Sequence, residues 1–305
     1  MPIHYPDILR EKSEPKTFTY TEKDVMLYAL GIGFGGDPMN ETELAFVYEK
    51  NLKVVPTAAS VLNASVGRPE MGCSDSNHRL SSVNYAMLVH GEQKIELHRP
   101  LPKSGTFTTF TRTIGAFDKG AGKGAVIVNE TIWSDAAGEK VATLTGTAFA
   151  RGDGGFGGPA VGAPQPHTVP DRAPDKTVEF VTRPGQALLY RLNGDRNPLH
   201  ADPEAAKRAG FDRPILHGLC TYGITCRAVL QEIVDYSPDR ILSHQVRFSS
   251  PVLPGDTVVV DLWLDGEVVS FEARAKERGV TVIKNGKTIL RQNVGLAADS
   301  IPQAG

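Results

Sequence analysis

Residues 190–217 read YRLNGDRNPLHADPEAAKRAGFDRPILH, and this stretch gives the first indication of the architecture of the whole chain. Directly after the turn-forming Gly194, it presents the carboxylate Asp195, the amide Asn197 and the imidazole His200. A carboxylate and an imidazole that reach a common point can hold one water molecule and exchange protons with it and with a substrate. The stretch therefore predicts a site that adds or removes water.

An apolar run with helical spacing follows directly. It predicts a long buried helix over residues 217–235, with apolar positions at Leu219, Ile224, Leu230 and Ile233. The first turn of a helix leaves backbone N–H groups unpaired, and Gly218 has no side chain to screen its own. Such an N–H suits an oxygen that gains negative charge during a reaction.

Each of these residues also has a purely structural interpretation. Residues 195–197 can simply form a turn, His200 can lie on the surface, and His217 can cap a helix or fill the core. The combination within one segment of about thirty residues favours a site, because acid, base and anion-stabilising donor then come together.

Two runs in this region, YRLNGDRNPLH (residues 190–200) and FDRPILHGLCTYG (residues 211–223), closely resemble the motif of the type 2, R-specific enoyl-CoA hydratases. These proteins are a branch of the MaoC-like hydratases. The resemblance covers the whole chain, since the two-unit members are as long as this one. It implies an α+β double hot-dog fold, in which an antiparallel sheet wraps around a long central helix in each half.

The resemblance also implies an activity, the reversible syn addition of water to trans-2-enoyl-CoA to give (3R)-3-hydroxyacyl-CoA. The family's catalytic positions correspond to Asp195, Asn197 and His200, with the backbone N–H of Gly218 on the thioester oxygen. Gly194 and His217 are expected to contribute to substrate binding. No metal and no cofactor is expected, because the substrate carries the coenzyme A. The division of acid and base roles between Asp195 and His200 stays open.

Length and composition restrict the remaining possibilities. The chain has 305 residues, 40% of them apolar, and a formal net charge of −2. That length suggests two domains at about 150 residues each. The absence of a basic block argues against nucleic-acid binding. No segment approaches the roughly 20 consecutive apolar residues of a membrane span. We therefore expect a cytoplasmic protein, and the resemblance suggests a homodimer.

The first half has the pattern of one α+β layer unit. A short helix is expected over residues 21–31, capped by Thr21. Residues 56–66 are expected to form the beginning of the first buried helix. Residues 67–84 are polar and are expected to form a surface loop, with a mobile flap beside a ligand entrance as the alternative. Strand-like runs follow at residues 86–97, 106–117, 125–134 and 140–150.

A Gly/Pro-rich segment then separates the first half from a second half with the same order of elements. Residues 152–175 form the linker. The predicted units are therefore 1–151, non-catalytic and accommodating the acyl chain, and 176–305, catalytic. A helix is expected over residues 184–192, and strands at residues 243–249, 257–264, 267–275, 280–284 and 287–296. Asn285-Gly286 predicts a hairpin turn between the last two strands.

An internal repeat supports this division. Aligning residues 28–33 with residues 190–195 places Gly33 opposite Asp195. The same alignment places Pro38 opposite His200 and Ala59 opposite His217. The first half thus has the scaffold without the polar residues, which suggests that it makes room for a bulky acyl group.

Two other functions are compatible with the same pattern. A hot-dog thioesterase would direct water at the thioester carbonyl instead of C3, and a non-catalytic acyl-CoA-binding subunit would use only the pocket. The intact Asp195, Asn197 and His200 triplet favours the hydratase over both.

Overall fold

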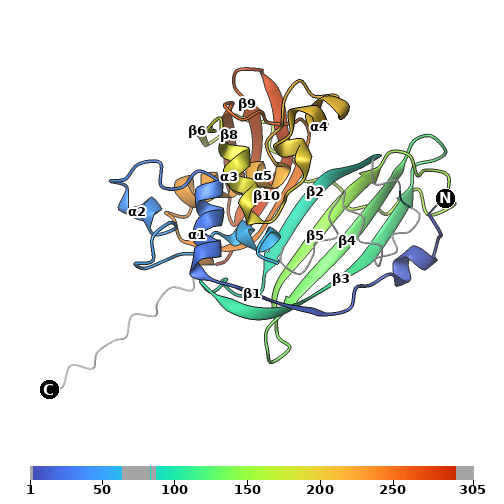
Figure 1. The fold of residues 1–305 in the computed structure, drawn as a ribbon, viewed down its shortest axis with the longest axis horizontal. Coiled ribbons are helices and arrows are strands. Elements are labelled where there is room, and N and C mark those ends of the chain that lie inside the picture. Colours follow the sequence, from blue (N-terminus) through green and yellow to red (C-terminus); the bar gives the residue numbers. More distant parts are fainter. Residues whose placement is uncertain (1–2, 64–82, 84–86, 293–305) are drawn as a thin grey trace.

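The computed structural model describes residues 3–63, 83 and 87–292. The described strands form one antiparallel ten-stranded sheet in the order β1-β3-β4-β5-β2-β7-β10-β9-β8-β6. Strands of the first half occupy one end of the sheet and strands of the second half the other (Figure 1). The two halves join where β2 pairs with β7, from Glu92 opposite Arg247 to Glu96 opposite Ser243.

The first half forms the strands that the alternation of residues predicts. They are β2 (Leu88–Leu97), β3 (Gly105–Asp118), β4 (Ala125–Ser134) and β5 (Lys140–Ala150). An edge strand that the sequence analysis did not predict, β1 (Lys16–Tyr20), pairs with β3. Its five residues alternate between the core and solvent, with Phe18 and Tyr20 packed against Trp133.

The second half wraps its strands around one helix. Its strands are β6 (Lys176–Val181), β7 (Ile241–Phe248), β8 (Thr257–Asp265), β9 (Val268–Ala275) and β10 (Val280–Leu290). The predicted central helix is α5 (Gly218–Glu232), with eleven buried residues. Burial on nearly all sides places the helix between its own sheet and the first half. The edge strand β6 is a second strand that the sequence analysis missed.

The predicted hairpin at Asn285-Gly286 is wrong, since both residues lie within the continuous strand β10. The register of β10 shifts against β7 between Lys284 and Lys287, and against β9 between Ile283 and Gly286. Asn285 takes the left-handed conformation, with φ 55°. The Asn-Gly pair therefore forms a β-bulge, because a left-handed residue can absorb an extra position while the strand continues.

The other described helices are shorter than α5. They are η1 (Asp7–Arg10), α1 (Glu22–Gly31), α2 (Glu41–Leu44), α3 (Gln186–Tyr190), η5 (Arg191–Asn193), η6 (Pro198–His200), α4 (Pro203–Arg208) and η7 (Pro238–Arg240). The predicted capping of α1 by Thr21 is confirmed, with a capping box to Asp24. Tyr28 and Tyr190, which the internal alignment equates, face each other across the halves with ring centroids 6.1 Å apart.

The predicted first buried helix is only partly described. Residues Pro56–Ser60 form the 3₁₀ helix η2, and every residue from 56 to 63 is buried. Residues 64–66 of this helix and nearly all of the loop predicted at residues 67–84 lie outside the described residues.

The predicted linker, residues 152–175, contains no helix or strand and is held against both halves. Near its start, Asp118 accepts N–H groups from Gly155 and Gly157 at 2.7 and 2.8 Å. Further on, the His167 ring lies 2.8 Å from the Ser270 hydroxyl. Within the described ranges, we find no helix with the length and apolar character that crossing a membrane requires.

Candidate active site

The motif begins with a tight turn that orients Asp195. Helix η5 ends at Asn193, and the next residue, Gly194, has a φ of 110°, a conformation that glycine adopts more easily than other residues. The Asn197 N–H then donates to Asp195 Oδ1 at 3.2 Å. The Asn197 side chain accepts the N–H of Leu199 at 3.0 Å and so caps η6. Asn197 therefore holds the geometry between the carboxylate and the histidine that follows it.

His200 is fixed by a backbone carbonyl from the second part of the motif. Its Nδ1 lies 2.8 Å from the Ile215 oxygen. Because a carbonyl only accepts, Nδ1 carries the proton and Nε2 keeps a lone pair in the neutral ring. Burial lowers the pKa of His200, although the Ile215 bond and the charge of Asp195 act in the opposite direction. The neutral form thus predominates at pH 7 and can accept a proton.

His217 lies behind His200 and stacks on it, with ring centroids 3.7 Å apart. Its Nε2 donates to the backbone oxygen of Asp195 at 3.2 Å, and its Nδ1 is buried without a partner. Burial and the neighbouring His200 lower the pKa of His217. The side chain is 1% exposed, so it supports the site from within the core. Its predicted role in substrate binding remains a prediction.

The three side chains form a compact polar group. One ligand atom each from Asp195, His200 and His217 lies within 4.8 Å of the others. That spacing suits a shared water molecule and also a metal ion. One nitrogen of each ring is already bonded to a carbonyl, of Ile215 and Asp195 respectively. The expectation of a metal-free site remains a prediction.

Gly218 is the first residue of α5 and lines the same cavity as Asp195 and His200. Its N–H has no acceptor within the helix, because the acceptor would precede the helix start. A Cβ at this position would lie 3.3 Å from the Phe248 ring, so the absence of a side chain keeps the approach open. A carboxylate, an imidazole and a helix-start N–H therefore line one space.

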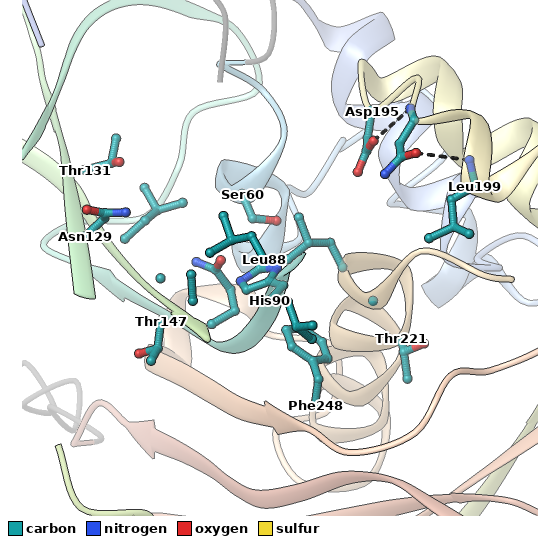
Figure 2. A pocket seen from close by; sticks show the side chains of 18 of the residues that line it. Ser60, Leu88, His90, Asn129, Thr131, Thr147, Asp195, Leu199, Thr221 and Phe248 are labelled. Carbon is teal, nitrogen blue, oxygen red and sulfur yellow. Dashed lines mark hydrogen bonds between the residues drawn. The ribbon is translucent and has the colours of Figure 1, made fainter. Parts of the chain in front are cut away.

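That space is a cavity of about 1150 Å³ lined by both halves. Figure 2 shows Asp195 and Leu199 on one side and Asn129 and Thr131, on β4, on the other. Ser60, Leu88 and His90 lie between them. The sequence analysis did not identify these first-half residues. For Asn129 and Thr131 the signal was the occurrence of polar residues at alternate positions along β4.

The strands of the two halves form one antiparallel sheet, and the polar group of Asp195, His200 and His217 lies in the second half. The profile of the MFE-2 hydratase 2 N-terminal domain matches residues 18–152, and that of the MaoC-like domain matches residues 164–286. The chain belongs to the MaoC-like dehydratase family, in its two-unit hydratase 2 form. The predicted family and fold class are thereby confirmed.

Two relatives of known name align over nearly their full length. The enoyl-CoA hydratase ChsH3 of Mycobacterium tuberculosis is 40% identical, over 94% of this chain and 98% of its own. The peroxisomal enoyl-CoA hydratase 2 of Arabidopsis thaliana is 38% identical, over 91% and 93%. Among solved structures, a MaoC-like dehydratase from Phytophthora capsici superimposes with a TM-score of 0.84. It is 37% identical, over 94% of this chain and 97% of its own.

Proposed function

We propose that this protein is an R-specific 2-enoyl-CoA hydratase, a hydro-lyase that acts in β-oxidation or related acyl-CoA metabolism. The observation that carries the proposal is the convergence of Asp195, His200 and the Gly218 N–H on one cavity. The names of the full-length relatives, enoyl-CoA hydratases from a bacterium and a plant, support it.

In the proposed mechanism, Asp195 and His200 hold one water molecule between them. As the water oxygen attacks C3, the pair takes up one of its protons and a proton is delivered to C2. The product gains OH at C3 and H at C2, so the atoms of one water are accounted for. Both groups approach from one side of the substrate, which gives syn addition.

The Gly218 N–H stabilises the thioester oxygen, which becomes enolate-like as the C3–O bond forms. A single preorganised donor of this kind is typically worth about 10²–10³-fold in rate. His217 is a positioning residue, because its hydrogen bond to the Asp195 carbonyl ties the turn to the start of α5.

The first test is an assay of the purified protein on trans-2-enoyl-CoAs of increasing chain length. We expect loss of the enoyl absorbance without release of free thiol, and a product oxidised by an R-specific and not an S-specific dehydrogenase. Thiol release would indicate the thioesterase instead. Binding without turnover of any substrate would indicate the non-catalytic subunit.

The proposal also covers the roles of the two halves, the oligomeric state and the cellular location. The first half accommodates the acyl group, the second half performs the chemistry, and the enzyme needs no cofactor. We also propose a cytoplasmic homodimer, although the Arabidopsis relative is named as peroxisomal. Light scattering of the purified protein and fractionation of the source cells test these two points.

A further inference from the structure

The first half contributes the imidazole of His90 to the wall of the cavity. His90 lies near the start of β2, at the end of the seam between β2 and β7, and Figure 2 shows it beside Phe248. The internal alignment gives the polar residues of the motif no counterpart in the first half. The presence of His90 in the cavity therefore needs an explanation of its own.

The alternation of β2 would place His90 on the outer face of the sheet. Gln93 and Ile95 are buried and define the inner face. Even-numbered positions of a regular strand lie on the opposite face. Lys94 and Glu96 follow this rule, since their side chains form an ion pair and are 39% and 42% exposed. By parity, His90 would point outward with them.

A β-bulge at Gly91 reverses this placement. Between His90 and Glu92, β2 advances by two residues while its partner β5 advances by one, so Gly91 is the additional residue. One additional residue exchanges the two faces for every position that precedes it in the strand. His90 therefore lines the cavity. A Cβ at Gly91 would lie 3.2 Å from the Thr147 backbone oxygen, so the bulge suits a glycine. Bulges that redirect a side chain are common next to active sites.

The His90 ring is held both by its own strand and by the second half. Its Nε2 lies 3.1 Å from the Glu92 backbone oxygen, and because a carbonyl only accepts, Nε2 carries a proton. The ring lies against Phe248 of β7, with centroids 4.9 Å apart and planes inclined by 56°. Aromatic rings in such an arrangement attract each other beyond the burial of their surfaces.

Phe248 in turn packs on Gly218, whose N–H we propose as the donor to the thioester oxygen. A Cβ at Gly218 would lie 3.3, 3.4 and 3.6 Å from three atoms of the Phe248 ring. Phe248 is the last residue of β7 and only partly buried against the core, so the core by itself leaves part of its ring unsupported. The contact with His90 supports the ring from the side of the first half.

We infer that His90 is a positioning residue of the active site, which holds the Phe248 ring on Gly218 and so keeps water away from the N–H that stabilises the thioester oxygen. A hydrogen bond to a developing charge is stronger where water is excluded. The inference rests on the proposed hydratase activity and gives the first half a part in its chemistry. In this role His90 acts through Phe248 and transfers no proton.

The test is a set of substitutions assayed on the trans-2-enoyl-CoA that the wild type hydrates best. His90→Ala removes the ring, and we expect kcat to fall by about two- to tenfold, the size of an aromatic pair, with KM nearly unchanged. The effect falls on kcat because the charge on the oxygen develops only in the transition state. His90→Phe restores a ring without an ionisable group and should recover most of kcat. His90→Gln keeps a donor for the Glu92 oxygen but has no ring, and should resemble His90→Ala.

A double-mutant cycle shows whether the effect passes through Phe248. In the Phe248→Leu background the contact between the rings is already lost, so His90→Ala should lower kcat no further. His98→Ala is the matched control. His98 follows the other end of β2, is exposed and bonds to the Thr143 hydroxyl at 2.8 Å, so its loss should leave kcat and KM unchanged. Melting temperatures of all variants show that each is assayed in the folded state.

Three results would overturn the inference and leave the hydratase intact. One is full activity of His90→Ala. Another is an equal loss in His90→Ala and His90→Phe, because the imidazole itself would then act on the substrate. The third is a further loss, of the same factor, when His90→Ala is added to Phe248→Leu. Absence of hydration by the wild type would instead reject the proposed function itself.

Discussion

The imidazole rings of His200 and His217 stack 3.7 Å apart, yet each is fixed to the backbone from the opposite part of the motif. His200 bonds to the Ile215 oxygen, and His217 bonds to the Asp195 oxygen. This crossed arrangement ties the turn around Asp195 to the segment that leads into α5. It also keeps two rings so close that a positive charge on one disfavours a charge on the other.

The pH dependence of activity should reflect the lowered pKa of His200. Burial shifts this pKa below the ordinary value of 6.5, so protonation removes the lone pair on Nε2 only in more acidic solution. We expect kcat/KM to be constant near pH 7 and to fall on the acid side with a midpoint below 6.5. Initial rates measured from pH 4.5 to 8 give this midpoint. Returning each sample to pH 7 checks that the loss of activity is reversible. A midpoint above 6.5 would contradict the assignment.

Substitutions of His200 and His217 should affect activity differently. His200→Gln removes an acid–base group, and we expect kcat to fall by about 10²–10⁴-fold with the fold intact. His217→Gln should weaken activity less and preserve the acid limb of the pH profile, because His200 still titrates. Circular dichroism and the pH profiles of both variants check this. Loss of the acid limb in His217→Gln would show that His217 itself transfers protons.

The carboxylate has its own test. Asp195→Asn keeps the shape of the side chain and removes its charge, and we expect a loss of about 10²–10⁴-fold in kcat with little change in thermal stability. Asp212→Asn, at an exposed position in the same segment, is the matched control and should retain full activity. If both variants lose activity equally, the effect is not specific to the site.

A buried ion pair joins the halves. Arg227 on α5 lies 2.5 Å from Glu43 on α2, with side chains 13% and 5% exposed, and its guanidinium stacks on Phe34 and Phe180. Glu43→Gln leaves the buried cation unpaired and should lower the free energy of unfolding by about 3–5 kcal/mol. Urea unfolding measures it. The exposed pair of Lys94 and Glu96 provides the control, since Glu96→Gln should cost less than about 1 kcal/mol.

The bulge in β10 requires a glycine. A Cβ at Gly286 would lie 2.3 Å from the Phe271 ring and 2.5 Å from its backbone oxygen. Gly286→Ala should therefore destabilise the protein by about 1–3 kcal/mol, as overpacking of a core does. Gly36, where a Cβ meets its first neighbour at 3.9 Å, is the control. Equal melting temperatures for the two alanine variants would contradict this account of the bulge.

The sequence predicted those parts of the fold that depend on neighbours along the chain. Helix α1 with its Thr21 cap, strands β4 and β5, and the start of α5 at Gly218 follow from capping and periodicity. The hairpin prediction failed because Asn285-Gly286 suits a tight turn and a bulge equally well. Pairing with β7 and β9 on both sides keeps the strand continuous there.

The short edge strands β1 and β6 escaped prediction for a related reason. Each has only five or six residues, and each pairs on one side only, with β3 and β8 respectively. Their own sequences carry too few alternating residues to indicate a strand. Their stability comes from a partner that lies far away along the chain.

The sequence by itself determined the local chemistry of this protein. Asp195, Asn197 and His200 lie within six residues, so a glycine turn and one cap are enough to set their spacing. Only the tertiary structure decided which residues of the first half lie across the cavity from these three side chains. The pairing of β2 with β7 places the first-half strands opposite the motif, and the sheet register sets Thr131 beside Thr111. The contacts between β2 and β7 join residues far apart along the chain, such as Glu92 and Arg247, and the packing of the two halves selects them.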